Sequence, residues 1–254
     1  MSDIQDRLQA LFPVHYRSGN VLLINANCME VMKHIRDGEF ELSCVDPPYG
    51  IGFDGEVEAM ANNNSVKWTQ AVGAGYDRKE WDAAPSSEYF EELRRVSKDQ
   101  IIWGGNYFDL PQSSGWIFWE KGTAEGFTLS PGELAWTSYQ NSVKRVAMLW
   151  AGFRKCEQGQ RIHPTQKPVK LYEWLLTNYA KPGQRILDTH GGSMSSVIAA
   201  INLGYDITCC ELDVDYFVAG VARVKQHQAQ GSLFMPDTVR DVYEQTDFLE
   251  GATE

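Results

Sequence analysis

Residues 184–211, "QRILDTHGGSMSSVIAAINLGYDITCCE", contain the pattern that decides the fold. A short apolar run, "QRILD", leads into a Gly-rich turn, then into a helix-period segment at 194–203, and then into a second apolar run at 205–211. Strand, turn, helix and strand in this order form a βαβ unit, whose two strands lie parallel in one sheet. The stretch therefore predicts an α/β fold.

The same alternation of strand and helix patterns extends along most of the chain. Runs rich in Val and Ile predict further strands at 20–26, 40–45, 100–104, 115–120, 133–137 and 144–150. Apolar residues at helical spacing predict further helices at 28–36, 86–97, 168–180 and 214–229. We therefore expect a doubly wound, mostly parallel sheet, formed by a single domain of 254 residues.

Charge is distributed unevenly along the chain. The formal net charge is −11, from 23 basic and 34 acidic residues, which by itself disfavours a polyanionic partner. The segment 144–170, however, has a local net charge of seven minus one, or +6. Its one acidic residue is Glu157, and its seven basic residues are Lys144, Arg145, Arg154, Lys155, Arg161, Lys167 and Lys170. This basic segment fits either phosphate contacts or a solvated surface, whereas 231–254 predicts a solvated acidic tail.

The sequence disfavours a membrane protein, a secreted protein and a metal site. No apolar run approaches the roughly 20 residues of a membrane-spanning helix, and the start "MSDIQDRLQALFP" carries acids where a signal peptide has basic residues. We therefore expect a cytoplasmic protein. Five cysteines, at 28, 44, 156, 209 and 210, form no CxxC pair and have no histidine nearby at zinc-ligand spacing, so we expect reduced, mostly buried thiols and no metal site.

The Gly-rich turn and the strand that follows it indicate a cofactor that contains a nucleoside. Gly191 and Gly192 follow a strand directly and let a ligand approach the backbone closely. Glu211 ends the next strand about 20 residues beyond the turn, where an acid in such a unit accepts hydrogen bonds from ribose hydroxyls. No GxxxxGK[ST] motif is present, which argues against an NTPase. Nicotinamide, flavin and S-adenosylmethionine remain as candidates.

The tetrapeptide "DPPY", Asp46 to Tyr49, selects among these cofactors. It follows the predicted strand at 40–45 and precedes residues 51–85, where many turn formers and few apolar repeats predict a mobile loop. An exocyclic amine on an aromatic base is a poor nucleophile until acceptors hold its N–H groups, and Asp46 and the Pro47 carbonyl are such acceptors. Tyr49 offers a ring on which an unstacked base can rest, at about 1–3 kcal/mol per base. These residues favour methyl transfer from S-adenosylmethionine to an amine.

Three motifs resemble the amino-methylating DNA methyltransferases that use S-adenosylmethionine. They are "DPPY" at 46–49, "HPTQKP" at 163–168 and "DTHGGS" at 188–193, in the order of the β class of that family. The resemblance covers about residues 20–228. It implies a Rossmann-like class I methyltransferase fold, S-adenosylmethionine as cofactor, and duplex DNA as substrate, with transfer to the N6 amine of a flipped adenine. It also implies a homodimer and a place in restriction-modification.

The resemblance assigns roles to individual residues. The amine pocket is assigned to Asp46, Pro47, Pro48 and Tyr49. The cofactor is assigned to Asn27, Thr165, Lys167, Asp188, His190, Gly191, Gly192, Ser193 and Glu211, with Glu211 at the ribose and Thr165 and Lys167 at the methionine end. DNA contact is assigned to the basic segment 144–162, through Lys144, Arg145, Arg154, Lys155 and Arg161, with Trp150 and Phe153 beside distorted DNA.

Three positions depart from the family pattern. Met194 stands where the family commonly has a further glycine, so its bulk bears on loop geometry or cofactor affinity unless the side chain points away. His190 stands in the place of a Phe, and it either contacts the cofactor or is structural. Asn27 stands in the place of an Asp, and it either reads the adenine edge of the cofactor or caps the helix that follows.

Three alternatives to adenine methylation remain open from the sequence. Cytosine N4 methylation is the nearest, because both targets are conjugated exocyclic amines; in the family, Asp at the first position of the tetrapeptide leans towards adenine and Ser towards cytosine. A catalytically silent DNA- or partner-binding protein would fit Met194, Asn27 and the negative net charge. An RNA or protein amine is the third alternative.

Overall fold

The computed structural model describes residues 3–51, 82–122, 130–151, 154–155 and 162–233. Its helices are α1 (Asp3–Leu11), α2 (Cys28–Met32), α3 (Ser87–Val96), α4 (Val169–Tyr179), α5 (Ser195–Leu203) and α6 (Val214–Leu233), with a short 3₁₀ helix at Gly105–Tyr107. The strands are β1 (His15–Ser18), β2 (Val21–Asn25), β3 (Phe40–Val45), β4 (Ser97–Trp103), β5 (Trp116–Glu120), β6 (Gly132–Thr137), β7 (Lys144–Ala147), β8 (Trp150–Ala151), β9 (Arg154–Lys155), β10 (Arg185–Asp188) and β11 (Asp206–Glu211).

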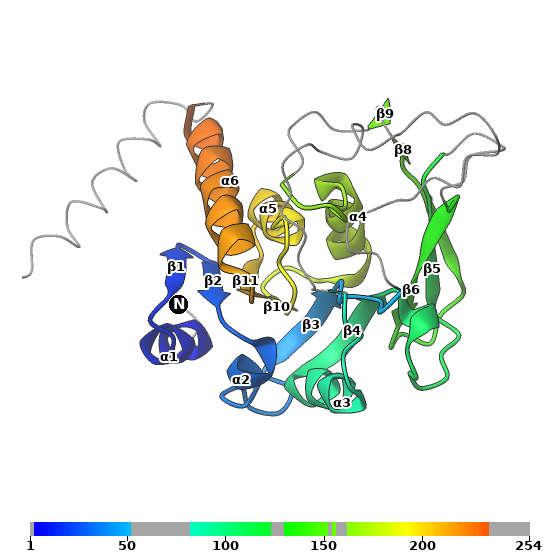
Figure 1. Cartoon of the computed structure of the whole chain (residues 1–254), viewed down its shortest axis with the longest axis horizontal. Coiled ribbons are helices and arrows are strands. Elements are labelled where there is room, and N and C mark those ends of the chain that lie inside the picture. The colour runs from blue at the N-terminus through cyan, green and yellow to red at the C-terminus, as the bar shows by residue number, and fades with distance from the viewer. Residues whose placement is uncertain (1–2, 52–81, 123–129, 152–153, 156–161, 234–254) are drawn as a thin grey trace, which may run out of the picture.

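Nine strands form one sheet in the order β1-β2-β11-β10-β3-β4-β6-β5-β7 (Figure 1). The five strands from β2 to β4 are parallel, whereas β1 is an antiparallel edge strand and β6 runs against both β4 and β5. The doubly wound, mostly parallel sheet predicted from the sequence is therefore confirmed. The chain leaves β10 for β11 and leaves β3 for β4, in opposite directions across the sheet. The winding reverses between β10 and β3, where folds of this kind bind their ligands.

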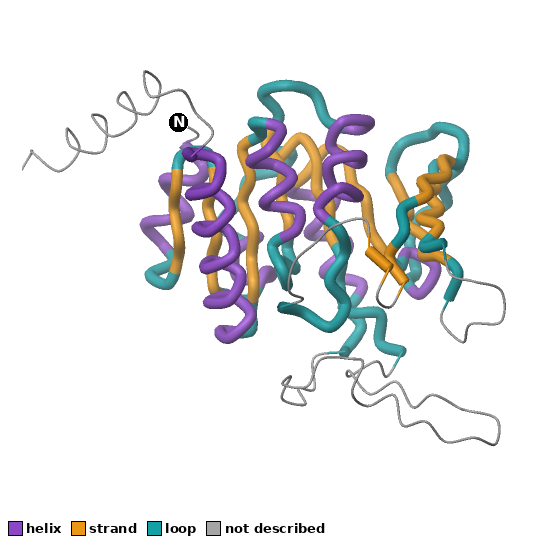
Figure 2. Tube along the Cα trace, turned by 90° about the horizontal axis from the view of Figure 1, so that it is seen from above, coloured by secondary structure: helices purple, strands orange, loops and turns teal. Residues whose placement is uncertain are grey.

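Helices cover both faces of the sheet (Figures 1 and 2). The helices α4, α5 and α6 lie on one face and α1, α2 and α3 on the other. Each face has its own buried cluster, and successive residues of β2 alternate between the two: Leu23 packs in the first cluster and Leu22 in the second. A strand buried on both faces reads as a continuous apolar run, which is why "VLLIN" was recognisable in the sequence.

The predicted elements differ from the observed ones in a few places. The predicted strand at 144–150 is interrupted, because β7 ends at Ala147 and Trp150 begins β8, which pairs with β9 in a separate two-stranded sheet. The predicted helix at 28–36 ends as an α-helix at Met32; beyond it, His34 N–H donates to the Val31 carbonyl and Ile35 N–H to the Met32 carbonyl, in tighter i to i−3 turns.

Two predicted segments lie almost wholly outside the described residues. Only residues 51 and 82–85 of the predicted mobile loop at 51–85 are described. Of the predicted acidic tail at 231–254, residues 231–233 continue α6, and the rest lie outside the description. In the described part of the chain, no helix combines the length and apolar composition needed to cross a membrane.

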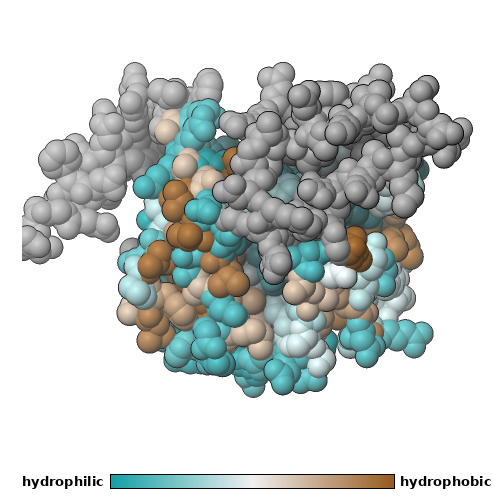
Figure 3. Space-filling view, in the orientation of Figure 1, coloured by the Kyte–Doolittle hydropathy of each residue, from teal (hydrophilic) through white to brown (hydrophobic). Residues whose placement is uncertain are grey.

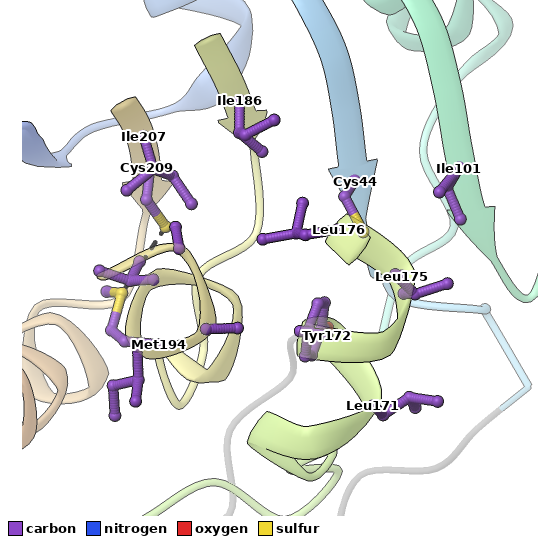
Figure 4. Close-up of a cluster of buried hydrophobic side chains, with 14 of the residues drawn as sticks. Cys44, Ile101, Leu171, Tyr172, Leu175, Leu176, Ile186, Met194, Ile207 and Cys209 are labelled. Carbon is purple, nitrogen blue, oxygen red and sulfur yellow. Dashed lines mark hydrogen bonds between the residues drawn. The ribbon is translucent and has the colours of Figure 1, made fainter. Parts of the chain in front are cut away.

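Met194 is held in a left-handed conformation immediately before α5. Its φ is 59° and its ψ is 29°, and it is the only residue other than glycine with positive φ among the described residues. The side chain is fully buried and directed at the sheet, where its sulfur lies 3.6 Å from Cys209 Sγ (Figure 4). A Cβ at Gly220 of α6 would lie 2.6 Å from Met194 Cγ, so glycine there makes room for the side chain. The bulk of Met194 is thus accommodated in the core.

We expect Met194→Gly to be more stable than Met194→Ala by about 1 kcal/mol. Both variants lose a buried side chain, at a cost of about 2–5 kcal/mol, but only alanine retains a Cβ in the left-handed conformation. Urea unfolding of both variants measures the difference. Met32, equally buried in α2, is the control: there Met32→Gly should be the less stable variant, because glycine weakens a helix. A Met194→Gly protein no more stable than Met194→Ala would contradict the interpretation.

Candidate active site

Three acids end three neighbouring strands at the point where the winding of the sheet reverses. Glu211 ends β11, Asp188 ends β10, and Asp46 follows β3 directly. The register places Asp188 beside Cys209 and pairs Leu187 with Ser43, so all three acids lie at the carboxyl edge of the sheet. Residues from the predicted amine pocket and the predicted cofactor turn are therefore brought to one edge of the molecule.

Lys167 binds the Asp46 carboxylate directly. Its Nζ lies 2.5 Å from Asp46 Oδ2 and 3.1 Å from Glu133 Oε2, and it donates to the Tyr49 hydroxyl at 3.1 Å. An ammonium group has three donors, and these contacts engage all three. The side chain is only 4% exposed. Lys167 thus contacts two residues of the predicted amine pocket, Asp46 and Tyr49, while its predicted place at the methionine end of the cofactor stays a prediction.

Burial and charge act in opposite directions on these groups. Burial raises the pKa of Asp46, and Lys167 offsets this shift only in part. Burial lowers the pKa of Lys167, but Asp46 and Glu133 outweigh burial and leave that pKa above its ordinary value. Glu133 faces two lysines, Lys167 and Lys121, which overcome its burial and lower its pKa to about 2. Glu133 is therefore a stable anion, whereas the Asp46 charge depends on Lys167.

Tyr49 is fixed at both ends of its side chain. Its hydroxyl donates to Asp46 Oδ1 at 2.9 Å, and its ring stacks on Tyr107 at a centroid distance of 5.2 Å and an angle of 20°. A Cβ at Gly104 would lie 2.2 Å from the Tyr49 ring, so glycine is needed for the backbone to pack against it. Burial and the neighbouring carboxylates raise the pKa of Tyr49 well above its ordinary value. Tyr49 is a neutral, pre-positioned aromatic surface.

The other two acids hold the Gly-rich turn. Asp188 accepts hydrogen bonds from His190 N–H at 3.0 Å and from the Ser196 hydroxyl at 2.5 Å. Glu211 accepts from Gly192 N–H at 2.7 Å and from Asp213 N–H at 2.8 Å, one on each carboxylate oxygen. Each carboxylate oxygen has two acceptor sites, so Glu211 keeps capacity for ribose hydroxyls. These hydrogen bonds fix the shape of the turn.

Asp188 is expected to make the protein less stable as the pH rises. Burial raises its pKa to about 7, from an ordinary value of 3.8, so the folded state binds more protons than the unfolded state between pH 4 and 7. Stability therefore falls across this window, by at most about 1.4 kcal/mol per pH unit. In Asp188→Asn this fall should be absent.

The measurement for Asp188 is urea unfolding at several pH values from 4 to 8. His163 and His190 act in the opposite direction, because burial lowers each pKa to about 4 and their contributions to stability rise with pH over the same window. The difference between variant and wild type therefore isolates Asp188. Parallel stability curves for the two proteins would contradict the assignment.

The remaining residues of the predicted cofactor set have structural contacts. His190 Nδ1 lies 2.9 Å from Thr189 Oγ1 and its ring packs edge-on against Tyr89 at 5.4 Å, which favours the structural alternative. Asn27 accepts from Met29 N–H at 2.9 Å and is the N-cap of α2, as the capping alternative predicted. Thr165 Oγ1 lies 3.1 Å from His163 Nδ1.

The two glycines and Ser193 complete the turn. A Cβ at Gly191 would lie 2.7 Å from both Cys209 Sγ and Met194 Sδ, so this glycine is required by the packing of the turn itself. Gly192 has a φ of +48°, which favours glycine. The Ser193 carbonyl accepts from Arg223 at 2.6 Å, which ties the turn to α6.

The predicted DNA-binding residues are only partly described. Lys144 Nζ lies over the Tyr179 ring at 4.8 Å, and Arg145 Nε donates to Glu120 at 2.7 Å, so both have partners within the chain. The backbone of β9 contains Arg154 and Lys155, while Arg161 and Phe153 lie outside the described residues. Trp150 is buried, and its indole N–H donates to the Gln166 carbonyl at 2.8 Å. The prediction that Trp150 supports DNA is therefore wrong.

Glu133 and Lys121 were missed by the sequence analysis. Glu133 lies on β6 and bonds both Lys121 and Lys167. An acid within the predicted strand at 133–137 was the one available signal, because a charge inside a sheet needs a partner.

The cysteines were predicted to be mostly buried. Cys44, Cys209 and Cys210 are buried, Cys28 is half-buried, and Cys156 lies outside the described residues.

Comparison with known proteins agrees with this geometry. Residues 132–221 match a protein family described as DNA methylase. YubD of Escherichia coli (strain K12), named as a methylase, is 26% identical over 235 residues, which cover 84% of this chain and 97% of the relative. The type II methyltransferase M2.MboI of Moraxella bovis is 24% identical over 237 residues, which cover 78% of this chain and 85% of the relative.

A solved structure, the PvuII DNA methyltransferase (cytosine-N4-specific), shares the fold with a TM-score of 0.54 at 12% sequence identity, over 91% of this chain and 93% of that one. The chain thus has the fold of class I methyltransferases. The family match and the similarity to named methyltransferases support a DNA methyltransferase of the N6/N4 class that uses S-adenosylmethionine.

Proposed function

We propose that this protein transfers a methyl group to the N6 amine of adenine in duplex DNA. The observation that carries the proposal is the Asp46 carboxylate, held by Lys167 at 2.5 Å and by the Tyr49 hydroxyl at 2.9 Å beside the Gly-rich turn. Asp46 is the first residue of the tetrapeptide. In the family that this motif resembles, Asp at the first position favours adenine over cytosine, which supports adenine as the target. Cytosine N4 is the second candidate, favoured by the similarity in fold to a cytosine-N4-specific enzyme.

The proposed mechanism uses direct transfer. S-adenosylmethionine supplies the methyl group as a sulfonium. Asp46 and the Pro47 carbonyl accept hydrogen bonds from the target amine, which localises the nitrogen lone pair, while Pro48 fixes the turn and Tyr49 supports the flipped base. The amine nitrogen would gain the methyl group as the carbon–sulfur bond of the sulfonium breaks and the neutral thioether leaves. Asp46 would stabilise the positive charge that develops on the nitrogen, whose surplus proton would pass to the Asp46 carboxylate and from there to solvent. Glu211, Asp188 and the turn at 188–193 would hold the cofactor.

Transfer of labelled methyl to mixed-sequence duplex DNA, followed by nucleoside analysis, tests the proposal. We expect N6-methyladenine. N4-methylcytosine alone would contradict the adenine assignment and favour the second candidate. RNA and protein, incubated in parallel, should take up no methyl groups; uptake into either in preference to DNA would overturn the substrate.

The proposal includes a basic DNA contact and a homodimer. Lys144, Arg145, Arg154, Lys155 and Arg161 would hold phosphates of the DNA backbone. Exposed apolar residues, Leu212, Val214 and Val218, lie where α6 begins, and Figure 3 shows hydrophobic residues gathered over this part of the surface. Such clusters often mark interfaces. Sedimentation velocity tests the dimer, which a strictly monomeric and fully active protein would contradict.

A further inference from the structure

Four side chains of alternating charge form a chain of contacts behind the amine pocket. Lys121 bonds Glu133, Glu133 Oε2 lies 3.1 Å from Lys167 Nζ, and Lys167 Nζ lies 2.5 Å from Asp46 Oδ2. Residues from β6, from the segment after β5 and from the segment before α4 thus meet the residue after β3. The mechanism described above gives Lys121 and Glu133 no role.

Two buried tryptophans exclude water from one side of this chain of contacts. Lys167 Nζ lies 5.2 Å from the Trp103 ring centre, and Lys121 Nζ lies 5.1 Å from the Trp119 ring centre. The two rings meet edge to face at 6.0 Å and are at most 1% exposed. Charges beside such a surface are poorly screened, so each affects the others strongly.

The four charges sum to zero, and this balance depends on Glu133. Lys167 has three donors, of which Glu133 takes one, Asp46 another and the Tyr49 hydroxyl the third. Glu133 therefore fixes the position of the ammonium that holds Asp46 as a carboxylate. Lys121, in turn, neutralises Glu133, which otherwise would compete with Asp46 for Lys167.

We propose that Glu133 is a positioning residue for methyl transfer, and that Lys121 and Glu133 together set the charge of Asp46 by holding Lys167 against it. The inference rests on the proposed function in one respect, the hydrogen bond from the target amine to Asp46. A neutral network leaves the Asp46 charge free to stabilise the positive charge that develops on the amine nitrogen, whether adenine or cytosine carries it.

The groups that bear on the Asp46 charge come from several elements. In direct contact are Lys167 and Tyr49, with Glu133 beside them. Further ionisable groups that interact electrostatically with Asp46 are Asp188 at the end of β10, Tyr172 on α4 and Cys44 on β3. The variants below alter Glu133 and Lys121 and leave the identity of all the other groups unchanged.

Three variants separate this role from a merely structural one. Glu133→Gln removes a negative charge, so Asp46 should lose its proton at a pH lower by about one unit or more. Lys121→Met removes a positive charge and lets Glu133 draw Lys167 away, so the Asp46 midpoint should move up by a similar amount. The double variant restores the charge balance, and its midpoint should return towards the wild-type value.

The titration is followed directly by NMR of protein labelled with ¹³C at the aspartate carboxyl carbons. The Asp46 signal is identified by its loss in Asp46→Asn. Midpoints that are equal in all four proteins, or that move in the same direction in both single variants, would overturn the proposal. Circular dichroism and thermal melting confirm that each variant is folded, and Lys121→Met tests the proposal alone if Glu133→Gln does not fold.

Single-turnover rates give the functional readout. At pH values below the Asp46 midpoint, a shift of that midpoint by one pH unit changes the ionised fraction of Asp46 tenfold. The acidic limb of the plot of rate against pH should therefore move with the NMR midpoint. Glu92→Gln on α3, which removes a surface partner of Arg95, is the control and should leave the profile unchanged. Wild type that methylates cytosine would overturn only the adenine assignment, whereas rate profiles that do not follow the midpoints would overturn the positioning role.

Discussion

Asp46→Ala is expected to lower the rate of methyl transfer by about 10³-fold or more while the protein stays folded. In the proposed mechanism, the change removes the acceptor that localises the lone pair of the target amine and the negative charge that stabilises the product cation. The fold should survive because Lys167 keeps two partners, the Glu133 carboxylate at 3.1 Å and the Tyr49 hydroxyl at 3.1 Å. The loss in stability should accordingly be smaller than the roughly 3–5 kcal/mol that follows when a buried ion loses its only partner.

The rate of Asp46→Ala is best measured in single turnover at saturating S-adenosylmethionine, with the dissociation constant of the cofactor measured separately by calorimetry. We expect the rate to fall and the dissociation constant to change less than threefold, since Glu211 and the turn at 188–193 are untouched. Asp206→Ala is the matched control, because Asp206 begins β11 at the opposite edge of the sheet. Equal loss of activity in both variants, or retained activity in Asp46→Ala, would disprove the assignment.

The sequence revealed the centre of the sheet because its strands are buried on both faces. β2, β3, β10 and β11 read as continuous apolar runs, and their residue bounds are close to those predicted. α1 escaped notice because its apolar content is sparse: Ile4 and Leu8 are its fully buried residues in "DIQDRLQAL". β1, "HYRS", is a half-buried edge strand with no apolar alternation. Elements at the margin of the fold carry weak patterns, since little of their surface is buried.

The site could be predicted only where its residues adjoin a recognisable motif. Asp46 and Tyr49 belong to one tetrapeptide, and their side chains are in direct contact. Glu133 is a single acid in a strand, and nothing in the sequence connects it with Lys167, which lies far along the chain. Met194 looked like an obstacle to the cofactor turn, because the space that Gly220 leaves for it exists only after α6 packs against α5. Contacts between residues distant in the chain were therefore the part of the site that could not be predicted from the sequence.

Lys167→Met is expected to have the largest effect on stability, about 3–5 kcal/mol. Methionine keeps the apolar length of the side chain but leaves the Asp46 and Glu133 carboxylates near each other without the cation between them. Lys121 still pairs with Glu133, so the uncompensated group is Asp46. Burial already raises the pKa of Asp46, and loss of Lys167 removes the main opposing effect. The Asp46 pKa should therefore rise further, and the rate of transfer should fall towards the acidic end of the pH range.

Two measurements on Lys167→Met separate the effect on folding from the effect on chemistry. Urea unfolding gives the loss of stability, and the pH dependence of the single-turnover rate should show activity that recovers as the pH rises, because the carboxylate forms only at higher pH. Lys98→Met is the matched control: Lys98 lies 3.3 Å from Glu41 but is 60% exposed, so its loss should cost less than about 1 kcal/mol. If Lys167 served the cofactor alone, the variant would bind S-adenosylmethionine weakly and keep the wild-type pH profile at saturating cofactor. A shifted profile with near-normal cofactor affinity would instead place Lys167 in the amine pocket, where its three contacts lie.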